Sequence, residues 1–268
     1  YGCDVTGADD ERFFRYSGPG TYERIFSSVP FDCCVNASGS PGVGYSLASP
    51  EKDYELNTQN VRLMLGAIRA HQPACRFINM SSAAVYGNPS RLPVSEDAMP
   101  APLSPYGKHK LEAEQVLETF HREHDLRTVS LRVFSVYGPR LHKQLFWDIF
   151  QKTKQSKKLE LFGTGEESRD FIYIRDLVRA LETVMENGAF AGECINVASG
   201  VETTIREAAS VFLDSLGGGF QLSFNGEVKA GDPKNWQADI SRISGLGFKP
   251  AVTIAEGLAL TVKDYRSV

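Results

Sequence analysis

A tyrosine and a lysine four residues apart, Tyr106 and Lys110, point most directly to proton chemistry in this sequence. They lie in the segment Ser104-Pro-Tyr-Gly-Lys-His-Lys, which is typical of a helix start. Residues four apart share one face of a helix, so the Lys110 ammonium is expected near the Tyr106 phenol. A nearby positive charge favours the phenolate, and we therefore predict that Lys110 lowers the pKa of Tyr106.

Two serines end a predicted strand one loop upstream. The segment reads Phe77-Ile-Asn-Met-Ser-Ser-Ala-Ala-Val-Tyr-Gly87. One of these hydroxyls would complete a proton-handling triad with Tyr106 and Lys110. The Tyr-x-x-x-Lys spacing alone is a weak signal, because many amphipathic helices contain it, and its meaning depends on the surrounding motifs.

Strand-like and helix-like segments alternate in the first half of the chain. Short apolar runs typical of buried parallel strands lie at 31–37, 76–80 and 128–134. Helical patterns cover 50–71 and 106–124. This alternation predicts an α/β fold with a parallel sheet and right-handed crossovers.

The spacing of the elements changes after Tyr137-Gly-Pro139. Short strands are predicted at 159–162, 171–173 and 194–197, and helices at 175–187, 204–216 and 254–265. We therefore predict a main domain over 1–138, to which some later segments return, and a smaller lobe formed mainly by 139–268.

Composition excludes several classes of partner. The 268 residues carry 29 Lys and Arg against 33 Asp and Glu, a net charge of -4 that gives no reason to expect nucleic acid or an anionic membrane. No apolar run reaches the roughly 18 residues of a membrane span. No signal peptide opens the chain, and the five cysteines form no C-x-x-C pair. We therefore expect a cytosolic protein with reduced thiols and no membrane or metal partner.

Three further motifs follow in order. They are Leu131-Arg-Val-Phe-Ser-Val-Tyr-Gly-Pro139, Gly163-Thr-Gly-Glu-Glu-Ser-Arg-Asp-Phe171 and Ile195-Asn-Val-Ala-Ser-Gly200. Together with the serine pair and Tyr-x-x-x-Lys, they make the chain resemble the extended short-chain dehydrogenase/reductase family, specifically nucleotide-sugar epimerases and dehydratases. The resemblance implies a Rossmann-type doubly wound parallel sheet with a smaller C-terminal α/β substrate lobe. It also implies NAD as cofactor and a nucleotide-diphosphate sugar as substrate.

The resemblance assigns roles to individual residues. Ser82 matches the catalytic serine, Tyr106 the base, and Lys110 the lysine that also holds the nicotinamide ribose. Asp9, with Asp10 beside it, matches the acidic residue that binds the adenosine ribose and favours NAD over NADP. Further positions match cofactor-binding residues of the family: Ala37, Ser38, Gly39, Asn57 and Phe134.

Four later residues match the nucleotide-sugar side of the family. Arg169 corresponds to an arginine that meets the pyrophosphate, a task that suits a bidentate guanidinium. Phe162 matches an aromatic residue that stacks on the base, although ordinary core packing explains it nearly as well. Asp232 belongs to a late Gly-Asp motif, and Lys229 replaces an arginine that is usual there.

Two departures from the family pattern matter. The G-x-x-G-x-x-G fingerprint is absent, and a βα unit of ~30 residues would be needed ahead of Tyr1. We therefore expect the first βα unit to be missing. The family's 4,6-dehydratases carry an Asp-Glu pair where this chain has Ala83 and Ala84.

The missing acids favour an NAD-dependent C4 epimerisation of a UDP-sugar through a transient 4-keto intermediate. The alternatives are an NAD(P)-dependent reductase of a 4-keto nucleotide sugar, a dehydratase, and a non-catalytic nucleotide-binding relative. By analogy with the family, the helices that flank Tyr106 are expected to form a homodimer interface.

Overall fold

The computed structural model describes residues 1–268 except 7–11, 19, 41, 228–230 and 268. It divides into two compact units. Unit 1 consists of Tyr1–Val85, Pro102–Arg132 and Gly188–Ile195. Unit 2 consists of Tyr86–Ala101, Val133–Asn187 and Asn196–Val268.

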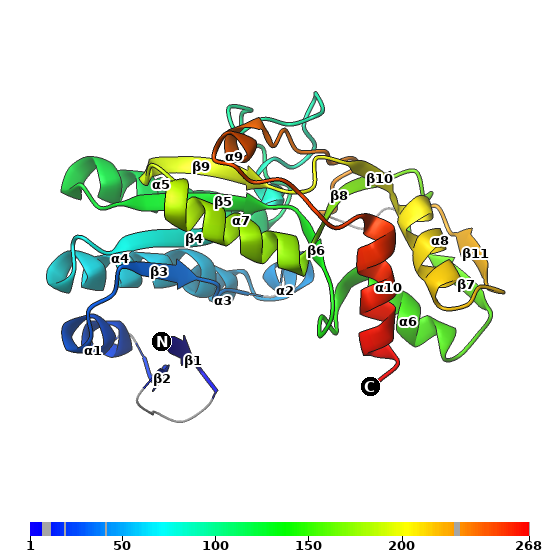
Figure 1. The fold of residues 1–268 in the computed structure, drawn as a ribbon, viewed down its shortest axis with the longest axis horizontal. Helices are drawn as coiled ribbons and strands as arrows, with labels where there is room; N and C mark the ends of the chain where they lie inside the picture. The colour runs from blue at the N-terminus through cyan, green and yellow to red at the C-terminus, as the bar shows by residue number, and fades with distance from the viewer. Residues whose placement is uncertain (7–11, 19, 41, 228–230, 268) are drawn as a thin grey trace. The chain divides into compact units, whose positions relative to one another are not determined.

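A four-stranded sheet has the order β3-β4-β5-β9 across its width (Figure 1). Its strands are β3 (Cys33–Asn36), β4 (Arg76–Ser82), β5 (Thr128–Val133) and β9 (Ala191–Val197). β3 and β4 run parallel, with Cys33 opposite Arg76. A separate parallel pair joins β1 (Gly2–Asp4) to β2 (Phe13–Arg15). The strands predicted at 31–37, 76–80 and 128–134 are thereby confirmed, with shifted ends.

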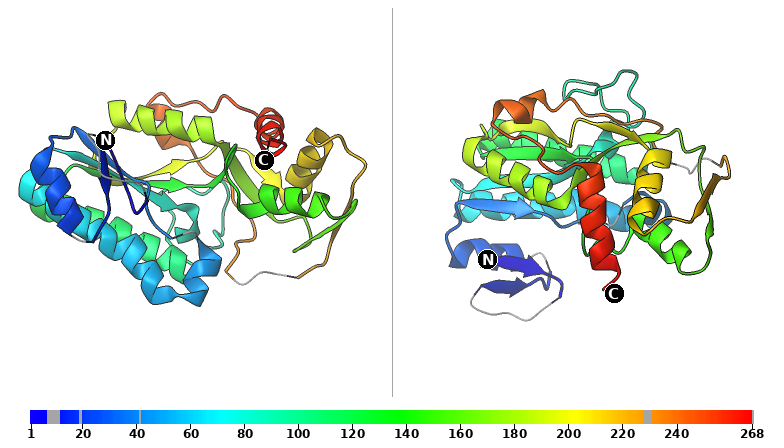
Figure 2. Two further views of the ribbon diagram at one scale, coloured as in Figure 1. Left: turned by 90° about the horizontal axis from the view of Figure 1, so that it is seen from below. Right: turned by 45° about the vertical axis from the view of Figure 1, so that its right-hand side comes forward.

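The helices of unit 1 pack around this sheet. They are α1 (Gly20–Ser28), α2 (Val43–Ala48), α3 (Pro50–Tyr54), the π-helix η1 (Glu55–Gln59), α4 (Asn60–His71), the 3₁₀ turn η2 (Ala83–Val85) and α5 (Pro105–His124). α5 packs on β4 and also contacts α4 (Figure 2). The helix predicted over 50–71 is confirmed in extent, but η1 interrupts it. π-helical turns are rare and are frequent at functional sites.

The core of unit 1 is apolar and fully closed. On α4, Val61, Leu65 and Ile68 are each 0% exposed, at the spacing of one helix face. They pack with Phe77 of β4 and Leu117 of α5 in one cluster. Burial of each such side chain stabilises the fold by about 1.5–3 kcal/mol, and it holds α4 and α5 in place.

The sequence around Ser104 explains where α5 begins. Ser104 is extended and its hydroxyl accepts a hydrogen bond from the Gly107 amide at 3.2 Å, which caps the helix. Pro105 follows at the first helical position, where its fixed φ suits the helix. The helix ends at Asp125, whose φ of 54° places it in the left-handed region. The helix predicted for 106–124 is confirmed.

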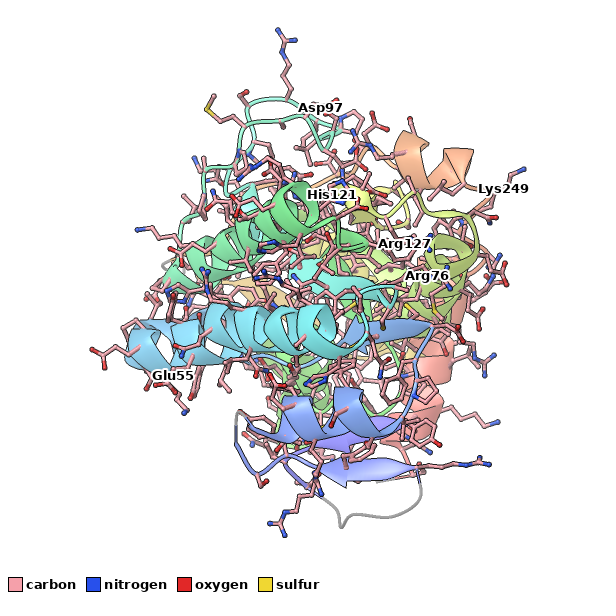
Figure 3. All side chains as sticks on the ribbon, turned by 90° about the vertical axis from the view of Figure 1, so that its left-hand side faces the viewer. Glu55, Arg76, Asp97, His121, Arg127 and Lys249 are labelled. Atoms are coloured by element: carbon pink, nitrogen blue, oxygen red, sulfur yellow. The ribbon has the colours of Figure 1, made fainter. Side chains whose placement is uncertain are left out.

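The end of the sheet at which β4 begins is basic. Arg76 and Arg127 lie near each other in Figure 3. Both guanidinium groups face the ring of Phe190, at 5.2 Å and 6.0 Å from its centroid. Since Arg76 opens β4 and Ser82 closes it, these arginines mark the end of the strand away from the serines.

Unit 2 contains two small sheets and an aromatic core. One sheet has the order β10-β8-β6, formed by β6 (Ser135–Tyr137), β8 (Ser168–Tyr173) and β10 (Glu202–Thr204). The other pairs β7 (Lys158–Leu161) with β11 (Gln221–Phe224) in parallel. The helices are α6 (Gln144–Thr153), α7 (Ile174–Asn187), α8 (Ile205–Ser215), α9 (Ser241–Gly245) and α10 (Ile254–Tyr265). α8 packs against α10 (Figure 2).

Unit 2 also shows what the sequence patterns missed. α6 was not predicted, although Phe146, Ile149 and Phe150 form a helical apolar face that is buried in the core. β6, β10 and β11 are only three or four residues long, too short for a clear alternation. Within the described residues, no helix is long and apolar enough to span a membrane.

Candidate active site

The candidate site is built where β4 ends and α5 begins. Ser82 is the last residue of β4, and its hydroxyl accepts a hydrogen bond from the Ala84 amide at 3.2 Å. A side chain at position 107 would place its Cβ only 2.6 Å from the carbonyl oxygen of Ala84. Gly107 therefore lets the first turn of α5 lie directly against η2, which brings Tyr106 to Ser82.

The Ser82 hydroxyl lies close enough to the Tyr106 phenol to influence its pKa. Burial raises the pKa of the Tyr106 phenol above its ordinary value, while the Ser82 hydroxyl opposes this effect and the Asp53 carboxylate adds to it. Without a further positive charge, the phenol is therefore held in its neutral form. A serine and a tyrosine in this contact can together hold the hydroxyl group of a ligand.

Lys110 lies beneath the same pair. Its side chain is 5% exposed, and its Nζ donates a hydrogen bond to the Met80 carbonyl at 2.8 Å. The Nζ atom is 5.8 Å from the centroid of the Tyr106 ring. Burial lowers the pKa of Lys110 to about 8, although the carboxylates of Asp53 and Glu114 act in the opposite direction.

The predicted lowering of the Tyr106 pKa by Lys110 is wrong for this structure. The two side chains do share one face of α5, as the spacing predicts. Burial, however, dominates the phenol's pKa, and Lys110 is not among the groups that shift it. The helical spacing correctly predicted that Tyr106 and Lys110 are neighbours. The direction of the Tyr106 pKa shift, however, depends on desolvation of the phenol.

The small-residue loop after β3 is exposed and tightly held. Ala37, Ser38 and Gly39 all lie at the surface. The hydroxyl of Ser38 donates to Oδ1 of Asn36 at 2.6 Å and accepts from Asn60 at 3.1 Å. These bonds fix the path of the backbone as it leaves β3.

Gly39, Asn57 and Lys110 converge at this loop. Gly39 has a φ of 144°, and a Cβ there would lie 2.6 Å from Oδ1 of Asn57 and 3.3 Å from Nζ of Lys110. Among the described residues, nothing hydrogen-bonds to the buried Oδ1 of Asn57. A bare backbone, a buried acceptor in need of a donor and an ammonium group suit a hydroxyl-rich ligand such as the ribose of a dinucleotide.

A second buried polar cluster adjoins Lys110, and the sequence patterns did not reveal it. Asp53 of α3 is 0% exposed, and its Oδ2 lies 2.5 Å from Nδ1 of His109. The Ser40 hydroxyl donates to its other oxygen. Asn57 in turn donates to Ser40 at 3.0 Å. The available signal was the histidine directly before Lys110, but its partner lies 56 residues away in sequence.

A third cluster lies on the other side of Lys110. Glu114 and Arg132 form a buried ion pair at 2.8 Å, and both side chains are nearly inaccessible. The hydroxyl of Ser81 donates to Glu114 at 2.5 Å. The two neighbouring serines therefore face different partners: Ser81 binds this ion pair, and Ser82 lies beside Tyr106.

The predicted nucleotide-sugar residues belong to unit 2. Arg169 donates to the carbonyls of Ser168 and Lys234 at 2.8 Å and 3.1 Å, and its guanidinium lies 5.5 Å from the Trp236 ring centroid. Burial lowers the pKa of Arg169, against the effect of the Asp232 carboxylate. The arginine is thus held by backbone carbonyls and packed on an aromatic ring, next to an exposed acid.

The two aromatic candidates differ in exposure. Phe162 is 48% exposed, which argues against the alternative that it is ordinary core. Phe134 is buried, with its ring 5.9 Å from that of Trp236, and its amide donates to the Val197 carbonyl at 3.1 Å. Its ring therefore serves packing within unit 2. Asp9, Asp10 and Lys229 lie outside the described residues, so their roles stay predictions.

Comparison with known proteins supports the family assignment. A model described as the NAD dependent epimerase/dehydratase family matches residues 12–198. An uncharacterized UDP-glucose epimerase of Bacillus subtilis is 33% identical over 230 residues, which cover 85% of this chain and 72% of that protein. A dTDP-glucose 4,6-dehydratase of Streptomyces niveus is 28% identical over 237 residues, with coverage of 88% and 70%.

The fold leads to the same group of proteins. A crystal structure of the UDP-glucose 4-epimerase of Thermotoga maritima with UDP-glucose matches with a TM-score of 0.89 at 26% identity. The match covers 99% of this chain and 90% of that one, and it agrees with the predicted α/β fold of Rossmann type. Sequence and fold therefore give one answer: the protein belongs to the NAD dependent epimerase/dehydratase family.

Proposed function

We propose that the protein is an NAD-dependent nucleotide-sugar epimerase that inverts C4 of a UDP-sugar. The observation that carries this proposal is the chain around the neighbouring side chains of Ser82 and Tyr106. The next two residues after Ser82 are Ala83 and Ala84, so the end of β4 and the start of α5 offer a hydroxyl and a base, while η2 offers no carboxylic acid that could expel water. Proton removal from a sugar hydroxyl is thus provided for, while dehydration lacks its acid.

The residues of unit 1 divide the proton chemistry among them. The hydroxyl of Ser82 would hold the C4 hydroxyl of the sugar against Tyr106. The Tyr106 phenolate would accept the proton of that hydroxyl and later return it to the same oxygen. Since burial raises the pKa of Tyr106, its phenolate would require added positive charge, which the oxidised nicotinamide of NAD would contribute when bound. NAD, when bound, would supply the reversible removal of hydride from C4.

Gly39, Asn57 and Lys110 would hold the ribose of NAD. The Lys110 ammonium donates one hydrogen bond to Met80 and has two further hydrogens for ribose hydroxyls. The buried Oδ1 of Asn57 would accept from a hydroxyl group, which satisfies an otherwise costly buried acceptor. Ala37 and Ser38, which are exposed on the loop after β3, would lie beside the bound cofactor. Phe134, Asp9 and Asp10 remain predicted cofactor residues.

The nucleotide part of the substrate is assigned to unit 2. Arg169 would bind the diphosphate, since its backbone contacts orient a guanidinium that still has free donors for phosphate oxygens. The exposed ring of Phe162 would stack on the base. Asp232 and Lys229 remain predicted substrate residues of the late loop.

The homodimer remains a prediction from the family resemblance, in which it would form through the helices that flank Tyr106. Light scattering of the purified protein would measure the mass of the assembly directly. A monomer at micromolar concentration would refute the homodimer.

Conversion of a panel of UDP-sugars tests the proposed activity. We expect interconversion of a C4 epimer pair without loss of water and without consumption of NADPH, read out by chromatography and mass spectrometry. Tyr106→Phe removes only the phenolic oxygen and should reduce turnover at least about 10²-fold while the fold is kept, as loss of a general base does.

Other products would identify the alternatives. A product lighter by one water would establish a dehydratase, and NADPH-dependent reduction of a 4-keto sugar would establish a reductase. Absence of turnover and of nucleotide-sugar binding in the parent protein would favour a non-catalytic relative. Near-normal turnover by Tyr106→Phe would refute the assigned base.

A further inference from the structure

Two carboxylates act on the buried ammonium of Lys110, and the proposed function uses neither. Asp53 lies on α3, and Glu114 lies one turn after Lys110 on α5. Both raise the pKa of Lys110 against the effect of burial. Asp53 also acts on Tyr106, whose pKa it raises further. Asp53 therefore acts on both Tyr106 and Lys110, whereas Glu114 acts on Lys110.

The partner of Asp53 is a titratable side chain. Nδ1 of His109 lies 2.5 Å from Oδ2 of Asp53, and the Ser40 hydroxyl occupies the other carboxylate oxygen. The backbone of His109 is held as well, since its carbonyl accepts from the Thr58 hydroxyl at 2.8 Å. The Asp53 carboxylate is thus oriented by the side chains of His109 and Ser40. His109 is held through its ring by Asp53 and through its backbone by Thr58.

Only one member of this pair reaches solvent. The Asp53 side chain is 0% exposed, whereas that of His109 is 14% exposed. His109 lines a surface hollow of about 380 Å³ together with Glu51, Tyr54 and Glu55. The Tyr54 ring meets the imidazole edge-on at a centroid distance of 5.5 Å. Protons from water therefore have access to His109 but not to Asp53.

The surroundings of Lys110 contain few other charges. In the described part of the chain, the charges that act on its ammonium are those of Asp53 and Glu114. Arg132 already neutralises Glu114. β4 contributes the Met80 carbonyl.

The remaining elements packed on α5 add no further carboxylate near Lys110. α2 carries Tyr45 as its titratable group, and η2 carries none. η1 contributes Glu55, which lines the outer hollow and pairs with Lys52 at 2.5 Å. α4 contributes the cations Arg62 and Arg69 and, in its last turn, His71, which pairs with Glu23.

We propose that Asp53 and His109 form a positioning pair: His109 and Ser40 hold the buried Asp53 carboxylate in place, and its negative charge keeps Lys110 in its cationic form. This inference rests on the roles proposed for Tyr106 and Lys110.

The titration of Lys110 tests this pair without any substrate. In protein labelled with ¹³C-lysine, the Cε signal of Lys110, assigned with Lys110→Met, follows the charge of the ammonium. We expect a midpoint near 8 in the parent. In Asp53→Asn the counter-charge is gone, and the midpoint should fall by about 1 pH unit, a tenfold loss of proton affinity.

Two histidine variants separate charge from packing. His109→Asn keeps a donor for Asp53 but cannot be charged, so the Lys110 midpoint should match that of the parent. His109→Leu removes the group that holds the Asp53 carboxylate in place, so the carboxylate is free to turn away from Lys110 and the midpoint should move in the same direction as in Asp53→Asn. Identical midpoints in the two histidine variants would overturn the proposal, even if Asp53→Asn fails to fold.

The same variants connect the pair to turnover. The pH profile of sugar interconversion should move to lower pH in Asp53→Asn, because the pKa values of Tyr106 and Lys110 both fall when the negative charge is removed. Lower turnover with an unmoved profile would show a merely structural role and overturn the proposal. Failure of the proposed function would appear as absent interconversion in the parent, which leaves the Lys110 titration fully readable.

Discussion

Glu114 and Asp53 are both buried carboxylates beside Lys110, but their partners differ. Arg132 contacts Glu114 through Nη2 at 2.8 Å and Nε at 3.1 Å, and Ser81 adds a third donor. Asp53 is paired with His109, which is partly exposed. A guanidinium stays charged at all relevant pH values.

The two ion pairs differ in their access to solvent. The Glu114–Arg132 pair joins α5 to β5, and both of its side chains are buried. The Asp53–His109 pair joins α3 to α5, and its His109 side chain reaches solvent. Burial of a carboxylate therefore does not by itself tell whether it is structural, and the chemistry of its partner decides.

The largest effect is expected when the Glu114–Arg132 ion pair is broken. Arg132→Met leaves the Glu114 carboxylate buried without its cation, which should reduce the free energy of unfolding by about 3–5 kcal/mol. Urea denaturation measures this loss. The double variant Arg132→Met, Glu114→Leu removes both charges and should recover much of the stability. A loss below about 1 kcal/mol in the single variant would contradict the structural role.

A smaller effect, dependent on pH, is expected from Lys110 itself. Its pKa is about 8 in the folded chain, against an ordinary value of 10.5, so the unfolded chain binds more protons between these values. Stability relative to Lys110→Met should therefore rise as pH increases from 8 to 10.5, by about 2–3 kcal/mol. Denaturation of both proteins at pH 7 and 10 checks this.

The pH dependence of Lys110 also bears on the comparison of the two carboxylates. Equal stability differences at both pH values would show that Asp53 and Glu114 fully offset the burial of the ammonium. The Glu114–Arg132 pair and the Asp53–His109 pair would then both act as full counter-charges of Lys110.

The smallest effect separates the two adjacent serines. Ser81→Ala removes a donor to Glu114 and should cost about 1–2 kcal/mol of stability with turnover unchanged. Ser82→Ala should instead lower turnover and leave the stability closer to that of the parent. Denaturation and initial rates on the pair of variants provide the test. A loss of turnover in Ser81→Ala alone would reverse the assignment of the two hydroxyls.

Local patterns predicted the elements that carry the candidate site. The cap at Ser104 and the apolar periodicity placed the helix at 106–124, and an apolar run placed the strand before Ser82. Such signals depend on residues within one or two turns of each other. The interruption of the 50–71 helix by η1 was not predicted, because no proline or other local breaker marks it.

Exposure and long-range pairing were less accessible to prediction. The pattern around Phe162 allowed stacking or core packing nearly equally, and its exposure argues for the first. The contacts of His109 with Asp53 and of Arg132 with Glu114 join residues 56 and 18 positions apart. No periodicity within one element indicates such partners.

The sequence by itself determined that Tyr106 and Lys110 share a helix face, that serines end the preceding strand, and that no acid follows them. These properties follow from residue order and helix geometry. The tertiary structure decided which serine meets Tyr106, which carboxylates face Lys110, and that burial raises the pKa of the phenol while lowering that of the ammonium. Desolvation and charge pairing arise only when distant segments pack together, which is why the folded chain alone sets the proton chemistry of this site.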